Sequence, residues 1–249
     1  QIAFFCDPNS GLKGLVAIHN SILGPALGGC RMWNYATEEE ALIDVLRLSK
    51  GMTYKAAIAG LNLGGGKAVI MGDSRNQKTE NLFRSFGRFV EGLGGRYITA
   101  EDVGTSIRDM EYVRMETNYV TGISQALGGS GDPSPVTAYG VYIGMKACVK
   151  EKLNKLSLSG LKVSVQGLGH VGMHLCRYLY KEDVELYVTD IDQNLIGKAV
   201  DEFNAQPVEI DKIIELDVDI YAPCALGATI NDQSIEQLKC SIIAGAANN

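Results

Sequence analysis

Two lysines, Lys55 and Lys67, lie in a mostly apolar stretch that runs from residue 51 to residue 73, and Lys67 directly follows three glycines. A lysine that is kept from water, or that lies beside another cation, loses proton affinity and can act as a general base near neutral pH. We interpret the pair as one ammonium group that holds an anion and one that reacts. The alternative is a tight glycine turn with both lysines in solvent.

A second candidate site is the glycine motif Gly167-Leu-Gly-His-Val-Gly172, between a strand predicted at residues 161–166 and a predicted helix. Glycines at such a junction let a pyrophosphate approach the helix N-terminus, where free N–H groups favour anions. A strand at residues 186–190 ends in Asp190, at roughly the spacing of about 20 residues expected for a ribose-binding carboxylate. The pattern predicts a Rossmann domain; the alternative is a helix–sheet junction that merely needs small residues.

Asp190 also favours NAD over NADP. A carboxylate accepts hydrogen bonds from a ribose 2′-hydroxyl but repels a 2′-phosphate, and residues 191–193 contain no Arg or Lys to reverse this. Cofactors in such folds lie beyond the carboxyl ends of the strands. Cys224 and Ala225 follow one later predicted strand, and Asn248 follows another, so these three residues are expected at the cofactor site.

Composition limits the class of protein. The chain has 249 residues, of which 46% are hydrophobic and 21% charged, and a net charge of −6, as in ordinary globular domains. Scattered basic residues and a negative net charge argue against a nucleic-acid surface, and no apolar run approaches the roughly 20 residues of a membrane span. The six cysteines form no C-x-x-C pair, which indicates reduced thiols and a cytoplasmic protein.

We predict no metal site. His170 and His174 share a helix face, but no Glu stands between them in the metalloprotease pattern and no carboxylate cluster is near in sequence. His19, at the end of a predicted strand, is expected to be a packed structural histidine.

Strand and helix patterns alternate along the chain, which predicts an α/β fold. Strands are expected at residues 2–6, 12–19, 68–71, 97–99, 119–121, 161–166, 186–190, 219–222 and 241–244. Thr37 and Glu40 fit a capping box that opens a helix carrying the chain to Lys55. Further helices are expected at residues 81–93 and 136–151, from Ser106, and directly after the glycine motif of residues 167–172. Residues 24–29 are predicted to form a loop. Residues 128–135, rich in Gly, Ser and Pro, predict an interdomain hinge; the alternative is a long surface loop.

Six short blocks occur in one order across nearly the whole chain, at residues 24–29, 52–55, 64–67, 99–104, 133–140 and 167–172. In these blocks the sequence resembles the amino-acid dehydrogenase family of glutamate, leucine, valine and phenylalanine dehydrogenases, and among them most closely the leucine dehydrogenases. The resemblance implies an N-terminal α/β substrate-binding and dimerisation domain at residues 1–131. It also implies a C-terminal NAD-binding Rossmann domain at residues 132–249, a cleft between the two domains, and a homo-oligomer. Family members extend further in both directions, so we expect the cofactor domain to be incomplete at its C-terminus.

The resemblance also implies roles for single residues. Lys55 matches the lysine that binds the substrate α-carboxylate, Lys67 the lysine that activates water, and Asp102 the carboxylate that exchanges protons with the substrate nitrogen; a plain ion-pair role is the alternative for Asp102. Thr137 would bind the nicotinamide carboxamide, and Asn248 or Asn249 the nicotinamide or the substrate nitrogen. The cofactor-binding set is then Thr137, Gly167, Gly169, His170, Val171, Gly172, Asp190, Cys224, Ala225 and Asn248.

The side-chain pocket is predicted from Leu27, Gly28 and Ala100. Glutamate dehydrogenases carry a lysine at the position matching Leu27, where it holds the side-chain carboxylate. Leucine offers no counter-charge, so an acidic substrate would be desolvated without compensation. We therefore expect NAD-dependent, reversible oxidative deamination of a branched-chain L-amino acid, leucine and also valine or isoleucine, to the 2-oxo acid and ammonium. The alternatives are a phenylalanine dehydrogenase and a non-catalytic NAD-binding regulator on the same scaffold.

Overall fold

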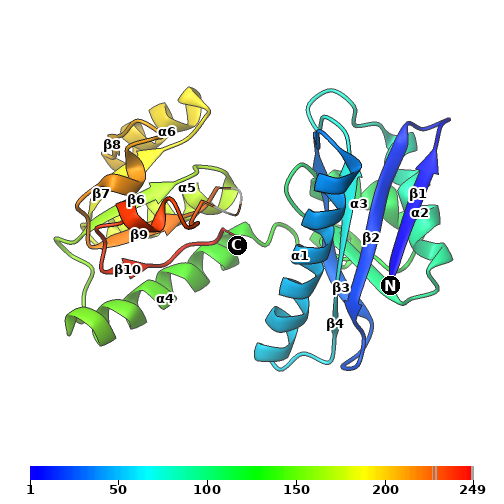
Figure 1. Cartoon of the computed structure of the whole chain (residues 1–249), viewed down its shortest axis with the longest axis horizontal. Helices are drawn as coiled ribbons and strands as arrows, with labels where there is room; N and C mark the ends of the chain where they lie inside the picture. The colour runs from blue at the N-terminus through cyan, green and yellow to red at the C-terminus, as the bar shows by residue number, and fades with distance from the viewer. Residues whose placement is uncertain (226, 228, 248–249) are drawn as a thin grey trace. The chain divides into compact units, whose positions relative to one another are not determined.

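The computed structural model describes residues 1–225, 227 and 229–247. The chain divides into two compact units, residues 1–132 and residues 133–249, with the division one residue beyond the boundary expected from the sequence. Each unit contains one five-stranded sheet. Helices pack against the sheet in both units, which are therefore α/β (Figure 1). The expected α/β class is therefore confirmed.

The sheet of the first unit mixes parallel and antiparallel pairs. Its strands are β1 (Ile2–Asp7), β2 (Leu12–Asn20), β3 (Ala26–Trp33), β4 (Gly64–Met71) and β5 (Tyr97–Glu101), in the order β1-β2-β4-β3-β5. β2 pairs antiparallel with both β1 and β4, whereas β3 pairs parallel with β4 and β5. The three parallel strands therefore end at one edge of the sheet.

Helices cover both faces of this sheet (Figure 1). α1 (Glu38–Ile58) packs on one face, where Ala41 and Val45 contact a small core of strand residues. α2 (Glu80–Gly92) and α3 (Ile107–Arg114) pack on the other face, over a larger core that includes Phe83 and Met110. A short 3-10 helix, Gln125–Leu127, follows. Because strand side chains alternate between faces, each position on β3, β4 and β5 is assigned to the α1 face or to the opposite face.

The predicted capping of α1 is confirmed in part. Thr37 is the N-cap and its hydroxyl accepts a hydrogen bond from the Glu40 N–H at 3.1 Å. The Glu40 carboxylate reaches one residue further back than a capping box requires and accepts from the Ala36 N–H at 2.9 Å. Ser106 caps α3 as expected, with the full reciprocal pair to Asp109.

The loop predicted at residues 24–29 is wrong, because β3 begins at Ala26. A Cβ on Gly28 would lie 1.7 Å from the Gly66 carbonyl oxygen, so this position needs glycine for close strand packing. Gly65 is close to α1 in the same way, since an added Cβ would lie 2.2 Å from the Thr53 nitrogen. Glycine here therefore serves the contact between neighbouring elements, and the tight turn considered for Gly64–Gly66 is also wrong.

The strand predicted at residues 119–121 is reduced to a single bridge, from Thr99 to Val120. The remaining expected strands and helices of this unit are present. Most ends differ by one or two residues, but β4 begins at Gly64, four residues before the strand expected at residues 68–71, and α1 ends at Ile58, three residues beyond Lys55.

The sheet of the second unit is entirely parallel. Its strands are β6 (Lys162–Gln166), β7 (Glu185–Thr189), β8 (Gln206–Pro207), β9 (Ile220–Pro223) and β10 (Ile242–Ile243), in the order β10-β9-β6-β7-β8. The helices are α4 (Ser134–Leu153), α5 (His170–Lys181) and α6 (Gln193–Phe203), with 3-10 helices at Ile213–Glu215 and Ile235–Gln237. Buried Val163, Val165 and Leu175 belong to its core. Parallel strands joined through helices are the architecture expected of a Rossmann domain.

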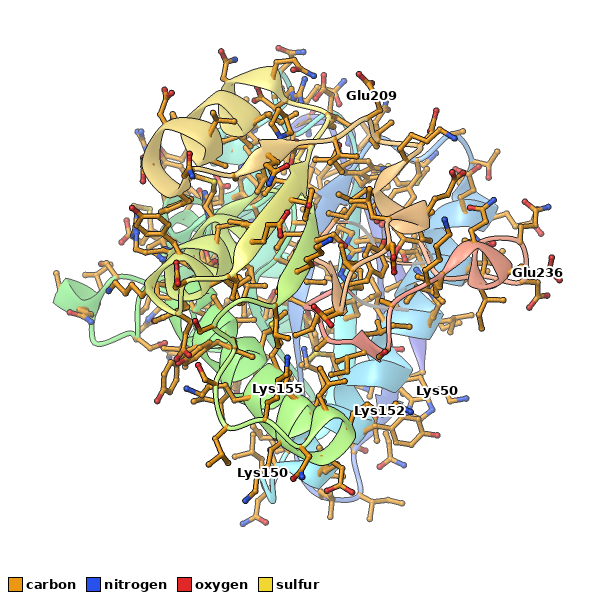
Figure 2. All side chains as sticks on the ribbon, turned by 90° about the vertical axis from the view of Figure 1, so that its left-hand side faces the viewer. Lys50, Lys150, Lys152, Lys155, Glu209 and Glu236 are labelled. Atoms are coloured by element: carbon orange, nitrogen blue, oxygen red, sulfur yellow. The ribbon has the colours of Figure 1, made fainter. Side chains whose placement is uncertain are left out.

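α4 begins within the segment predicted to be a hinge. Ser134 and Pro135 are its first residues, and proline is tolerated there because the first N–H groups of a helix lack intrahelical partners. At the opposite end, Lys150, Lys152 and Lys155 lie together, whereas Glu209 and Glu236 lie elsewhere on this unit (Figure 2). Lysines at this end complement the negative pole of the helix dipole. Among the described residues, no helix is both long and apolar enough to cross a membrane.

Candidate active site

Lys67 lies in the middle of β4 and is buried, with 4% of its surface exposed. It shares the α1 face with Val69, two residues further along the strand, which packs against α1. Its Nζ contacts Asp102 Oδ2 at 2.9 Å. The ammonium group of Lys67 therefore contacts a carboxylate and is shielded from most of the solvent, which confirms the prediction that Lys67 is kept from water.

Asp102 follows the last residue of β5, at the edge where the parallel strands end. Its backbone N–H donates to Thr105 Oγ1 at 2.9 Å, and the Thr105 hydroxyl donates in turn to the Cys30 carbonyl at 2.8 Å. A Cβ on Gly29 would lie 2.8 Å from the Asp102 Cβ, so glycine at that position leaves room for the carboxylate. The loop is thereby tied to β3, and the Asp102 side chain is held against the sheet.

Arg31, on β3, is a third member of this cluster that the sequence analysis missed. It is 5% exposed, and its Nε donates to the Asp102 Oδ2 that also contacts Lys67, at 3.0 Å. Its Nη1 donates to Asp44 Oδ2 on α1 at 2.9 Å, and the Tyr35 hydroxyl donates to the same oxygen at 2.7 Å. An arginine between Cys30 and Met32 would have been a signal had β3 been recognised as a strand.

The charges of this cluster shift the pKa values of Lys67 and Asp102. The pKa of Lys67 is lowered, first by burial and then by the neighbouring Arg31 and Lys55 cations, against the opposing effect of Asp102. Burial alone would raise the pKa of Asp102, but Lys67 and Arg31 together lower it. The cluster therefore holds an ionised carboxylate beside a lysine that gives up its proton more readily than a lysine in water.

Lys55 occupies the last turn of α1 and is exposed, so the alternative of two lysines in solvent holds for Lys55 and is wrong for Lys67. Its charge nevertheless contributes to the lowered pKa of Lys67, which places the two ammonium groups within electrostatic reach. An exposed cation near a buried one is free to bind an anion from solution.

Leu27 and Ala100 lie on the α1 face together with Lys67. Leu27 pairs with Gly65 on β4 and with Ile98 on β5, and Ala100 pairs with Gly29, so their side chains share one side of the sheet. Both are half-buried. Gly28 contributes backbone only, and its carbonyl accepts a hydrogen bond from the buried Tyr97 hydroxyl at 2.6 Å.

The second glycine motif joins β6 to α5. Gly167 has φ +97°, and a Cβ on Gly172 would lie 2.0 Å from the Gly167 carbonyl oxygen, so both positions require glycine. Gly169 is the N-cap of α5, has no side-chain capping bond, and would meet no atom within 4 Å if it carried a Cβ. His170 and Val171 begin the helix. The free N–H groups there and the open space over Gly169 fit a dinucleotide pyrophosphate.

Other predicted cofactor residues gather at the carboxyl edge of the same sheet. Asp190 follows β7, and its Oδ2 accepts from the Leu168 N–H at 2.5 Å while Oδ1 accepts from the Asp192 N–H at 2.9 Å. Cys224 follows β9, and its N–H donates to the Gln166 carbonyl at 2.7 Å. Asp190 and Cys224 therefore flank the glycine motif on its two sides.

Ala225 and Thr137 lie at this edge too. A Cβ on Gly167 would lie 2.6 Å from the Ala225 nitrogen, which places Ala225 directly over the motif. Thr137 is in the first turn of α4, is exposed, and donates its hydroxyl hydrogen bond to the Pro133 carbonyl at 3.0 Å. Because α4 leads back to the start of β6, its first turn lies towards the carboxyl edge. Asn248 and Asn249 lie outside the described residues.

The remaining candidates are the histidines and cysteines. His19 is exposed, so the expectation of a packed histidine is wrong, although its Nδ1 lies 2.8 Å from Thr53 Oγ1 on α1. All six cysteines are free thiols. Within the described ranges, no group of three or more His, Cys, Asp or Glu side chains is placed to hold a metal ion.

Comparison with known proteins identifies similar dehydrogenases. Residues 1–119 match the family model described as "Glu/Leu/Phe/Val dehydrogenase, dimerisation domain". Over its full 249 residues the chain is 59% identical to leucine dehydrogenase from Bacillus subtilis (strain 168) and covers 68% of that protein. It is 59% identical to leucine dehydrogenase from Thermoactinomyces intermedius, with the same coverage.

The solved structures agree in fold. L-tryptophan dehydrogenase from Nostoc punctiforme is 47% identical, with a TM-score of 0.72 over 100% of this chain and 70% of that one. A hetero-hexameric glutamate dehydrogenase from Thermus thermophilus is 21% identical, with a TM-score of 0.81 over 99% and 66% of the two chains, and it shows the fold alone. The full-length identity to leucine dehydrogenases and the match to the family model together establish that the chain belongs to the Glu/Leu/Phe/Val dehydrogenase family.

Proposed function

We propose that the protein catalyses the NAD-dependent, reversible oxidative deamination of a branched-chain L-amino acid, leucine and also valine or isoleucine, to the 2-oxo acid and ammonium. The observation that carries this proposal is the buried contact of 2.9 Å between Lys67 Nζ and Asp102 Oδ2, on a sheet face that also holds two apolar side chains. The identity of 57–59% to several leucine dehydrogenases supports the substrate class.

The reaction requires two proton transfers. Asp102 is ionised because its pKa is lowered, so it can accept a proton from the substrate ammonium group. Lys67, whose pKa is also lowered, acts in its neutral form as the base that takes a proton from water as that water adds to the substrate iminium carbon. The nicotinamide of NAD supplies the hydride acceptor. Lys55 is exposed in the last turn of α1, where it pairs with the substrate α-carboxylate.

Substrate choice follows from Leu27 and Ala100. Their side chains lie on the same face of the sheet as Lys67, and neither carries a positive charge that could pair with a carboxylate in the substrate side chain. Apolar pockets separate substrates by only about 1–3 kcal/mol per methylene, so leucine, valine and isoleucine should all be used. A phenylalanine dehydrogenase is the alternative within the family, and a relative of that name is 47% identical. A non-catalytic NAD-binding regulator would have no use for Lys55, Lys67 and Asp102 together.

For the cofactor, we propose NAD held by the second unit. Gly167, Gly169 and Gly172 would leave space for the pyrophosphate, and the N–H groups of His170 and Val171 would face it. Asp190 would bind the ribose hydroxyls and exclude a 2′-phosphate, while Thr137, Cys224, Ala225 and Asn248 would contribute to the nicotinamide side of the site. The open space at Gly169 supports this proposal.

We also propose that residues 1–132 form the substrate-binding and dimerisation domain, residues 133–249 form the NAD-binding domain, and the protein is a homo-oligomer. The description of the matched family model as a dimerisation domain supports an assembly of subunits. The free cysteines fit a cytoplasmic enzyme, since thiols stay reduced there.

The test is NADH formation at alkaline pH by the full-length protein, with L-leucine, L-valine, L-phenylalanine and L-glutamate compared at equal concentration, and with NADP replacing NAD in a second series. We expect the branched-chain substrates and NAD to give the largest kcat/KM. Activity with glutamate alone would refute the argument from Leu27, and a preference for NADP would refute the one from Asp190. NAD binding with no turnover of any amino acid would favour the regulator.

A further inference from the structure

Arg31 joins both acidic partners of the cluster, and its contacts differ from those of an ordinary ion pair. One nitrogen of its guanidinium donates to Asp102, after β5, and another donates to Asp44, on α1. A planar guanidinium can bridge two carboxylates in fixed directions, whereas the ammonium group of a lysine is a single point charge. Arg31 therefore ties the end of the sheet to the covering helix.

The two oxygens of Asp102 are not equivalent. Oδ2 receives both Arg31 Nε at 3.0 Å and Lys67 Nζ at 2.9 Å. Oδ1 accepts no hydrogen bond from the part of the chain that the structure describes, and 19% of the Asp102 side chain is exposed. A carboxylate that is held through one oxygen presents the other in a defined direction.

We propose that Arg31 is a positioning residue, which holds Asp102 through Oδ2 and leaves Oδ1 as the atom that accepts the proton of the substrate nitrogen. This inference rests on the proposed function. Asp44 acts one step further out, because it fixes the other side of the guanidinium and is itself held by the Tyr35 hydroxyl.

Several charged or titratable groups surround Lys67, and only some of them influence its proton. Asp102 comes from the end of β5, Arg31 from β3 and Lys55 from α1. Cys30, also on β3, remains a neutral thiol because burial raises its pKa. On β2 the titratable residues of the same face are Lys13, which pairs with Glu38 at 2.7 Å, and His19, whose ring contacts Thr53. Arg31 and Lys55 lower the pKa of Lys67, so loss of Arg31 must raise it.

The variants are Arg31→Lys and Arg31→Met, with Arg47→Gln as the matched control. Arg47 donates to the same Asp44, through Oδ1 at 3.2 Å, and makes no contact with Asp102. We expect Arg31→Met to lower kcat with L-leucine at least 100-fold and to move the acid limb of the kcat/KM profile to higher pH. Arg31→Lys keeps the charge and loses the bridge, so it should leave the limb near its original pH and still lower kcat at least tenfold.

A purely structural role predicts a different pattern, in which both Arg31 variants lose thermal stability while folded protein keeps the wild-type pH profile. That result, or Arg31 variants that behave as Arg47→Gln does, would overturn the proposal. Because Arg31→Met removes a buried charge, Arg31→Lys provides the second variant if Arg31→Met does not fold.

A readout independent of turnover separates this inference from the proposed function. Acetic anhydride modifies neutral amines, so the pH dependence of Lys67 acetylation, measured by peptide mass spectrometry, follows its proton. We expect the midpoint to lie at higher pH in Arg31→Met than in wild type and Arg47→Gln. If wild type oxidised no amino acid but the midpoint moved, the proposed function would fail and the effect of Arg31 on Lys67 would stand. An unmoved midpoint would overturn the inference even in an active enzyme.

Discussion

Replacing Asp102 with asparagine removes a carboxylate that contacts two buried cations, Arg31 and Lys67. Lys67 Nζ and Asp102 Oδ2 are 2.9 Å apart, which corresponds to an attraction of about 6 kcal/mol at an effective dielectric constant of about 20. Much of that attraction offsets the cost of removing the charges from water, and loss of one partner of a buried pair typically costs about 3–5 kcal/mol. We therefore expect Asp102→Asn to lower the free energy of unfolding by about 3–5 kcal/mol.

The same substitution should affect catalysis separately from stability. General-base groups contribute about 10²–10⁴-fold to rates, so kcat with L-leucine should fall by at least 100-fold. Asp102 raises the pKa of Lys67, so its loss should shift the acid limb of the pH profile to lower pH, opposite to the shift expected for loss of Arg31. The two opposite signs distinguish a specific charge network from general damage.

The matched control is Asp109→Asn. Asp109 is also buried in the first unit and pairs with Lys78 at 2.5 Å, away from the proposed reaction centre. Urea unfolding and NADH absorbance would be measured for both variants. We expect both to lose stability and only Asp102→Asn to lose kcat. If Asp102→Asn kept kcat within threefold of wild type, or if both variants lost kcat equally, the assignment of Asp102 would be refuted.

Three further predictions follow from other parts of the structure. Leu27→Lys places a cation on the half-buried apolar face, so kcat/KM for L-leucine should fall at least tenfold relative to that for L-glutamate, which an unchanged ratio would contradict. Gly169→Ala has room for its methyl group and should fold, but the methyl group would occupy the space proposed for the pyrophosphate and raise the Kd for NAD in equilibrium dialysis. The control Gly197→Ala, in the middle of α6, should leave that Kd unchanged. Equal Kd values for the two variants would argue against pyrophosphate at Gly169. The pKa of Lys67 is lower in the folded protein than in the unfolded chain, so between the two pKa values the unfolded chain binds more protons. The free energy of unfolding should therefore rise with pH from the folded-state pKa to about 10.4. Lys67→Met should flatten this rise in urea titrations at several pH values, and an unaltered slope would contradict the lowered pKa.

The chemistry of the reaction centre was predictable from sequence because its residues are distinctive in type and order. A lysine after three glycines and an aspartate at the end of a short strand remain visible without knowledge of their partners. The pairing of Lys67 with Asp102 depends on β4 and β5 lying on either side of β3, which no local pattern states. The order of motifs in the family resemblance supplied that information instead.

Arg31 was missed for a physical reason. Gly24, Gly28 and Gly29 suggested a loop, because glycine is usually costly within a strand. In the folded chain these positions are crowded by neighbouring backbone, so glycine is the residue that permits β3 to form. Once β3 is a strand, Arg31 falls on the same face as Lys67, and its role follows from alternation.

His19 and Lys55 show a second limit of sequence reasoning. Alternation places His19 on the face that α1 covers, and helical spacing places Lys55 near the end of that helix. Neither pattern states where the covering helix stops burying the sheet. Both residues are exposed, and the extent of coverage is a property of packing in three dimensions.

The measurement that bears most directly on this account is the rate of NADH formation from L-leucine by full-length wild type and by its Lys67→Ala variant. Exposed Lys50, also on α1, provides the control variant Lys50→Ala. We predict an active wild type, an equally active Lys50→Ala protein, and a loss in kcat of at least 1,000-fold for folded Lys67→Ala. A folded Lys67→Ala protein as active as its parent would contradict the central claim that the buried amine of Lys67 takes part in the reaction.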